Sequence, residues 1–124
     1  MHTSYSPLAQ RRITIVGLGL MGGSLALALR GKCAGITAVD SDAHTRRVGL
    51  QRGVVDCASK SLAEGVARAD LLVLAAPVRV ILELLMQLRQ LQPSAQEALP
   101  VLDLGSTKAE ITAAMAALPE RFDC

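Results

Sequence analysis

The chain of 124 residues has almost no aromatic side chains: one Tyr, one Phe and no Trp. Its core must therefore be aliphatic, and hydrophobic residues make up 51% of the sequence. No apolar run approaches the about 20 residues that a membrane-spanning helix needs. The first residues, MHTSYSPLAQRR, lack the apolar centre of a secretory signal peptide. The composition favours one aliphatic globular domain, and no membrane partner is expected.

Neither cysteine nor charge is arranged as in a known type of binding site. Cys33, Cys57 and Cys124 are an odd number without C-x-x-C spacing, which argues against a metal site and a disulfide framework. The net charge is +2, with acids and bases interspersed and no basic stripe with interleaved aromatics. Nucleic acid is therefore not an expected partner, and reduced thiols in the cytoplasm are expected.

The sequence does contain one ordered stretch, which runs from Arg12 to Asp40. It begins with the β-branched run ITIV, continues into GLGLMG, a match to G-x-G-x-x-G, and then becomes rich in Leu and Ala. A second β-branched run ends at Asp40, about twenty residues after Gly19. Strand, glycine loop, helix, strand and acid in this order are typical of a βαβ unit that binds a dinucleotide.

Each glycine of this loop has a predicted role. Gly17 turns the chain out of the strand, Gly19 leaves room for a pyrophosphate, and Gly22 lets the helix pack close to the strand. The helix N-terminus would direct free N–H groups and the positive end of its dipole at the phosphates. Asp40 would accept hydrogen bonds from both ribose hydroxyls of an adenosine and would repel a 2′-phosphate. NAD is therefore the expected cofactor, and NADP is expected to bind less tightly.

The rest of the chain alternates short apolar runs with helical segments. Further strands are expected at 54–55, 71–76 and 100–104. Further helices are expected from a cap at Ser41 or Asp42 to about 52, at 61–68, from 77 to about 91, and at 107–118. The tail at 120–124 has no evident partner in the sequence.

This alternation predicts the fold class, which is α/β. We expect a Rossmann-type doubly wound parallel sheet in three layers, with strand order 3-2-1-4-5. Residues 1–11 are expected to be a flexible lead-in, and residues 12–124 one nucleotide-binding domain. The ligand would lie across the carboxyl ends of strands one and four.

Three further segments each allow two interpretations. The small residues at 75–78 either pack a strand-to-helix corner or leave room for the ribose and nicotinamide. The segment DLGSTK at 103–108 either caps a helix or adds a hydroxyl and an ammonium near the nicotinamide. Arg46 and Arg47, together with Ser41, either form a solvated helix face, which is favoured, or bind a 2′-phosphate.

The segments ITIVGLGLMGGSLALAL, ADLLVLAAPV and VLDLGSTKAEI together resemble the nucleotide-binding half of prephenate dehydrogenases, a family that includes arogenate and cyclohexadienyl dehydrogenases. The similarity spans about residues 12–124. It implies an NAD(P)-dependent enzyme that oxidises prephenate or arogenate with loss of CO₂ on the route to tyrosine. It also implies that Ser106 is catalytic, approaching the substrate hydroxyl and the nicotinamide.

The resemblance further implies parts that this sequence lacks. The family's catalytic His lies in an H-P-M-x-G-type motif, and the chain ends at Cys124 before any such motif. The helical substrate and dimerisation domain of the family is also absent, so we expect a cofactor domain that is inactive alone and forms a homodimer only with that domain. Two alternatives stay open: a related β-hydroxyacid or imine dehydrogenase, and a non-catalytic nucleotide-sensing module.

The predicted site contains no metal. The residues predicted to hold the cofactor come from the glycine loop, from the end of the second strand and from the segments after strands four and five. They are Gly17, Gly19, Leu20, Met21, Gly22, Asp40, Ala76, Pro77, Val78 and Ser106.

Overall fold

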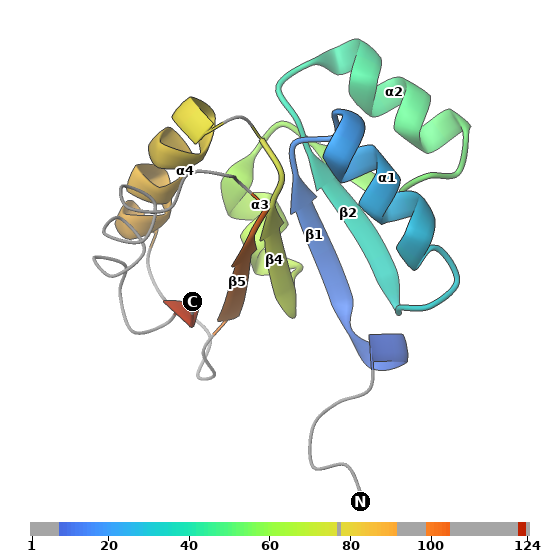
Figure 1. Ribbon diagram of the computed structural model, residues 1–124, viewed down its shortest axis with the longest axis horizontal. Coiled ribbons are helices and arrows are strands. Elements are labelled where there is room, and N and C mark those ends of the chain that lie inside the picture. The colour runs from blue at the N-terminus through green and yellow to red at the C-terminus, as the bar shows by residue number, and fades with distance from the viewer. Residues whose placement is uncertain (1–7, 77, 92–98, 105–121, 124) are drawn as a thin grey trace, which may run out of the picture.

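The computed structural model describes residues 8–76, 78–91, 99–104 and 122–123. Within these residues the chain forms one six-stranded sheet in the order β3-β2-β1-β4-β5-β6 (Figure 1). Every pair of neighbouring strands in it is parallel. The strands are β1 (Arg12–Val16), β2 (Gly35–Val39), β3 (Cys57–Ser59), β4 (Leu71–Leu74), β5 (Leu99–Asp103) and β6 (Phe122–Asp123).

Helices cover both faces of the sheet (Figure 1). They are α1 (Leu20–Leu29), α2 (Ala43–Gln51), α3 (Leu62–Ala67) and α4 (Val78–Gln90), after a short 3₁₀ turn, η1 (Leu8–Gln10). One apolar cluster joins the sheet to α1, and the other joins it to α3 and α4. The predicted doubly wound fold with strand order 3-2-1-4-5 is therefore confirmed, with β6 added beside β5. None of the described helices is long and apolar enough to cross a membrane.

The central strand β1 is buried on both faces, as a parallel sheet between helices requires. Ile13 and Ile15 point to the cluster with α1, while Val16 points to the cluster with α3 and α4. Thr14 is fully buried, and its Oγ1 donates to the Gly65 carbonyl at 2.8 Å. A Cβ at Gly65 would overlap neighbouring side chains, so this glycine lets α3 lie close to the sheet.

The prediction of a strand at Val54 and Val55 is wrong, because these two residues close helix α2. Both of their N–H groups donate to the Gly49 carbonyl, at 2.9 and 3.3 Å, and Gly53 before them has a φ of +68°. The apolar side chains belong to the core and not to a strand: Val55 is buried there, and Val54 packs against the same cluster. The strand itself begins at Cys57, which pairs with Thr37 of β2.

The expectation that the tail lacks a partner is also wrong. Phe122 and Asp123 form β6, which pairs in parallel with Leu99 and Pro100 of β5. A strand of two residues leaves no periodic signal in a sequence, so pattern analysis could not find it. The helix expected at 107–118 lies outside the described residues.

Candidate functional site

The carboxyl edge of the sheet is where β1, β2 and β4 end side by side. The Gly17 N–H donates to the Val39 carbonyl at 2.7 Å, and the Ala75 N–H donates to the Val16 carbonyl at 2.8 Å. These bonds continue the ladder by one residue, after which the chains separate. Gly17 has a φ of +96°, and a Cβ there would lie 3.0 Å from the Ala75 carbonyl oxygen. Both the left-handed backbone and the close approach of β4 favour glycine at this turn.

Two glycines of the same loop have opposite surroundings. A Cβ built at Gly22 would overlap the Gly17 carbonyl oxygen and would lie 3.3 Å from the Ala75 Cβ. A Cβ built at Gly19 would meet no atom within 4 Å. Gly22 is therefore required by the packing of the protein itself, whereas the space beside Gly19 is open.

The first turn of α1 offers unpaired backbone donors to this open space. Gly19 caps the helix without any side-chain hydrogen bond, and the first helical bond runs from the Gly23 N–H to the Gly19 carbonyl at 2.7 Å. The N–H groups of residues 20–22 precede that bond, where the helix provides no acceptor. Leu20 is 89% exposed and Met21 is 54% exposed, so the turn lies at the surface. Such a helix start favours an anion.

Asp40, directly after β2, faces the glycine loop. Its Oδ2 accepts from the Leu18 N–H at 2.8 Å, and its Oδ1 accepts from the Asp42 N–H at 2.9 Å. Arg46 donates from Nη1 to the main-chain carbonyl of Asp40 at 2.7 Å. Each carboxylate oxygen can accept more than one hydrogen bond, so Asp40 keeps capacity for a ligand hydroxyl.

Asp42 is the residue that caps α2, which decides between the two predicted caps. Its Oδ2 accepts from the Thr45 N–H at 3.1 Å and from the Thr45 hydroxyl at 2.6 Å. These hydrogen bonds, that of the Thr45 side chain foremost, lower the pKa of Asp42 below its usual value. The cap fixes the start of α2 immediately after Asp40.

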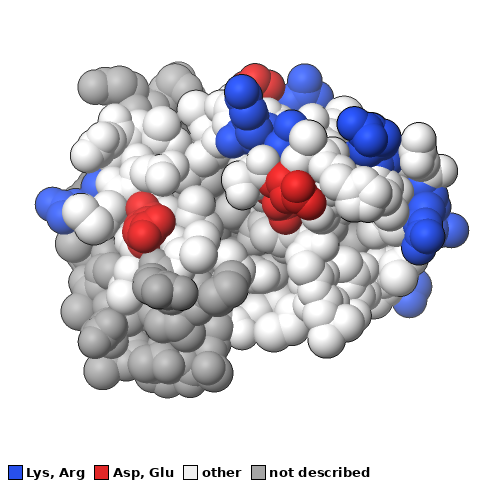
Figure 2. All heavy atoms as spheres, turned by 90° about the horizontal axis from the view of Figure 1, so that it is seen from above, with Lys and Arg blue, Asp and Glu red and all other residues white. Residues whose placement is uncertain are grey.

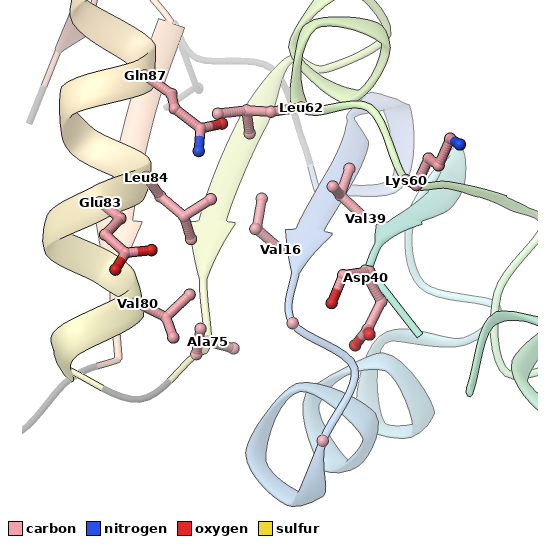
Figure 3. Close-up of a pocket in the computed structure, with 14 residues that line it drawn as sticks. Val16, Val39, Asp40, Lys60, Leu62, Ala75, Val80, Glu83, Leu84 and Gln87 are labelled. Atoms are coloured by element: carbon pink, nitrogen blue, oxygen red, sulfur yellow. The ribbon is translucent and has the colours of Figure 1, made fainter. Parts of the chain in front are cut away.

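A pocket of about 550 Å³ opens at this edge, and Figure 3 shows it. We call it the edge pocket; strand ends and loops form one side, and a face of α4 forms the other. Its volume lies in the range of about 300–1,000 Å³ that is usual for small-molecule sites. It is lined by Val16, Gly17, Gly19, Val39, Asp40, Ser41, Lys60, Leu62, Ala75, Ala76, Val80, Glu83, Leu84 and Gln87.

The wall that α4 contributes to the edge pocket was not predicted from the sequence. Val80, Glu83, Leu84 and Gln87 project from α4 toward the strand ends (Figure 3). Their spacing of i, i+3, i+4 and i+7 defines one helix face, and this signal was available. Lys60, which follows β3, was also missed, because the third strand was placed too early in the chain.

The structure brings several predicted residues together and leaves others outside its description. Gly17, Gly19, Asp40 and Ala76 line the edge pocket. Leu20, Met21 and Gly22 form the first turn of α1 beside it. Pro77 and Ser106 lie outside the described residues, and Val78 is described only as the first residue of α4.

The charges around this edge are uneven. Figure 2 looks down on the carboxyl edge and shows acidic side chains scattered over it, separated by uncharged residues. Most of the Lys and Arg side chains visible there lie over the half of the molecule that α1 and α2 form. Among the described residues, no group of three or more His, Cys, Asp or Glu could hold a metal ion.

A parallel doubly wound sheet, a glycine loop that opens a helix and an acid after β2 together define a Rossmann-type nucleotide-binding domain. Comparison with known families gives the particular one. The family model described as prephenate dehydrogenase, nucleotide-binding domain, matches residues 25–122, and the chain belongs to this family. The resemblance noted from the sequence is confirmed.

Individual relatives agree with this assignment. The chain is 35% identical over 102 residues to the prephenate dehydrogenase of Lactococcus lactis, covering 82% of this chain and 28% of that protein. It is similar to a crystal structure of prephenate dehydrogenase from A. aeolicus in complex with hydroxyphenyl propionate and NAD+. That match has a TM-score of 0.77 and 30% identity over 97% of this chain and 41% of the other.

A second solved structure, the arogenate dehydrogenase of Synechocystis, gives a TM-score of 0.73 at 31% identity. It covers 85% of this chain and 36% of that protein. The chain spans only about 30% of the length of the curated prephenate dehydrogenases that it matches.

Proposed function

We propose that this chain is the cofactor-binding part of an NAD-dependent prephenate or arogenate dehydrogenase, which performs an oxidative decarboxylation on the route to tyrosine. The observation that carries the proposal is the position of Asp40, at the edge pocket and opposite the open first turn of α1. The family assignment supports this substrate class over a β-hydroxyacid or an imine.

The residues present fit a dinucleotide. The open space at Gly19 and the N–H groups of the first turn of α1 would hold the pyrophosphate. Asp40 would accept hydrogen bonds from the ribose hydroxyls of the adenosine, and the apolar side chains of Val80 and Leu84 offer a surface for a flat base. When bound, the nicotinamide would accept a hydride from the carbon that bears the ring hydroxyl of the substrate.

Two arrangements at Asp40 support NAD over NADP. Its carboxylate carries the charge that would repel a 2′-phosphate. Arg46, which could have bound that phosphate, donates instead to the main-chain carbonyl of Asp40. Lys60 also lines the edge pocket, and it is the cation that would reverse the preference if it reached the ribose.

The catalytic step is assigned to groups outside the described residues. Ser106 is proposed to approach the substrate hydroxyl, and no His of this chain matches the family's motif. A general base typically contributes about 10²–10⁴-fold to a rate, and positioning of the substrate can contribute about 7–11 kcal/mol. We therefore propose that residues 12–124 bind the cofactor and do not turn over substrate without a further domain.

Calorimetric titration of the chain with NAD and with NADP tests the cofactor assignment. NAD is expected to bind more tightly, and equal or tighter binding of NADP would show that Lys60 or Arg46 outweighs Asp40. Formation of NADH from prephenate or arogenate is measured on the same sample. Binding without turnover is expected, whereas robust turnover would show that a residue of this chain, such as Lys108 or His44, acts as the base.

A further inference from the structure

The carboxylate of Asp40 has partners inside the protein before any ligand is present. Its two oxygens accept from the backbone N–H groups of Leu18 and Asp42, at 2.8 and 2.9 Å. Hydrogen bonds to an ionised acceptor are about twice as strong as those between neutral groups. A residue that served only the ribose of a cofactor would not need both of these bonds.

The first of these bonds reaches into the glycine loop. Leu18 lies between Gly17 and Gly19, and its side chain is buried against the core. Glycines on both sides give this segment more backbone freedom than other residues would allow. Asp40 Oδ2 therefore restrains the loop at the point where its own sequence restrains it least.

The second bond reaches the start of α2. Asp42 accepts from Thr45 as the helix cap, and Arg46 one turn later donates back to the carbonyl of Asp40. These hydrogen bonds join both sides of the corner between β2 and α2 and hold the backbone of Asp40 in place. The carboxylate connects this rigid corner to the glycine loop.

We propose that Asp40 is a positioning residue as well as a ligand for the ribose: its carboxylate holds the glycine loop, and with it the first turn of α1, in the anion-binding arrangement before the cofactor arrives. This inference rests on the proposed dinucleotide binding. Such preorganisation strengthens binding because the loop loses less conformational freedom when the pyrophosphate is bound.

The two roles of Asp40 give opposite results with a ligand that lacks the adenosine ribose hydroxyls. If Asp40 acted only through those hydroxyls, Asp40→Ala would not weaken binding of the 2′,3′-dideoxyadenosine analogue of NAD. The affinity for the analogue would stay equal or rise, because a negative charge near the pyrophosphate is removed. If Asp40 positions the loop, the same substitution weakens binding of the analogue.

Asp56 provides a matched control. Its Oδ2 accepts from the backbone N–H of Ile36 at 2.8 Å, the same type of bond as that from Leu18 to Asp40. Asp56 directly precedes β3, at the opposite end of the sheet from the edge pocket, and it does not line the pocket. Asp56→Ala therefore reports what a lost backbone–carboxylate bond does to the fold in general.

The experiment measures the affinity of NAD and of the dideoxy analogue for the wild type, Asp40→Ala, Asp40→Asn and Asp56→Ala. For the analogue we expect about tenfold weaker binding to Asp40→Ala, from the loss of about one charged hydrogen bond. A smaller loss is expected for Asp40→Asn, which keeps one acceptor, and none for Asp56→Ala. Equal or tighter binding of the analogue by folded Asp40→Ala would overturn the proposal. If Asp40→Ala does not fold, Asp40→Asn decides in the same way.

Hydrogen exchange of the Leu18 amide in the ligand-free protein tests the inference apart from the proposed function. Exchange is expected to be about tenfold faster in Asp40→Ala than in the wild type and unchanged in Asp56→Ala. If the wild type binds neither ligand, the proposed function fails, and the Leu18 exchange rate alone decides whether Asp40 holds the loop. An unchanged rate in Asp40→Ala would overturn the positioning role.

Discussion

At each of the two edges of the sheet an aspartate accepts hydrogen bonds from backbone N–H groups, but the two aspartates serve different purposes. At the amino edge, Asp70 accepts from the Arg12 N–H at 2.8 Å and also pairs with the Arg12 guanidinium at 3.2 Å. At the carboxyl edge, Asp40 accepts from two backbone N–H groups, while the nearby Arg46 donates to its carbonyl instead of its carboxylate. At the amino edge the Arg12 side chain neutralises Asp70, whereas at the carboxyl edge the charge of Asp40 faces the edge pocket. The difference separates an aspartate that joins strands from one that is available to a ligand.

The most severe change at the carboxyl edge is Gly22→Val. A Cβ at this position overlaps the Gly17 carbonyl, which is backbone and cannot rotate away. The cost is expected to exceed the about 3 kcal/mol that is usual for overpacking, so little folded protein should form. Circular dichroism and thermal unfolding measure this, and a normal unfolding transition would show that α1 can shift away from β1.

The same substitution three residues earlier, Gly19→Val, is the matched opposite. No atom lies within 4 Å of a Cβ there, so the melting temperature should stay near that of the wild type. Cofactor binding should be lost, since the side chain fills the space proposed for the pyrophosphate. Calorimetry on the folded variant tests this. Retained binding would place the pyrophosphate elsewhere, and loss of folding would make this glycine structural.

Asp40→Ala addresses the charge that faces the pocket. It should weaken NAD binding by roughly 2–4 kcal/mol, because the two hydrogen bonds proposed from the ribose hydroxyls to the charged carboxylate are lost. The preference for NAD over NADP should also shrink, because the repulsion of the 2′-phosphate disappears. Titrations with both cofactors give the affinities for NAD and for NADP. An unchanged ratio of these affinities would mean that Asp40 does not discriminate between a hydroxyl and a phosphate at the 2′ position.

The smallest effect is expected at the amino edge. The hydrogen bond from the Arg12 side chain, the largest cause, lowers the pKa of Asp70 below its usual value. A lowered pKa in the folded state stabilises the protein at neutral pH, and this contribution is lost as the pH falls below about 4 through the folded pKa. The two side chains are 57% and 41% exposed, so solvent screening limits the contribution to about 1 kcal/mol or less.

Asp70→Asn should therefore lower the free energy of unfolding slightly at pH 7. The difference from the wild type should vanish in acid, where Asp70 is protonated in both states. Urea unfolding at the two pH values measures this, and cofactor affinity should not change at neutral pH. A loss of affinity in Asp70→Asn would show that the two edges are coupled through β1 and β4.

The strand order and the glycine loop could be predicted because their signals are local. The run ITIV, the glycines at 17, 19 and 22 and the acid at 40 each restrict the backbone or its neighbours within one βαβ unit. The strand predicted at Val54 and Val55 does not form, because the turn imposed by Gly53 and by hydrogen bonds to the Gly49 carbonyl outweighs their β propensity.

The pocket wall on α4 depends on tertiary structure. Glu83 and Gln87 lie far from Asp40 along the chain, and only the packing of α4 against the sheet brings them to the same hollow. Polar side chains such as these usually mark the solvent-facing side of a helix, and a ligand pocket also opens to solvent. Sequence periodicity identifies a helix face, but it does not show which part of the structure lies opposite that face.

The parallel sheet has a consequence for how the pocket forms during folding. Neighbouring strands in a parallel sheet are joined by crossovers instead of hairpins, so their contacts form only after long loops have closed. The edge pocket draws residues from the segments after β1, β2, β3 and β4 and from α4. It therefore cannot exist in a chain that has assembled only one βαβ unit. In a refolding experiment, recovery of ligand binding should trail recovery of helical signal, and the ligand should slow unfolding more than it speeds folding.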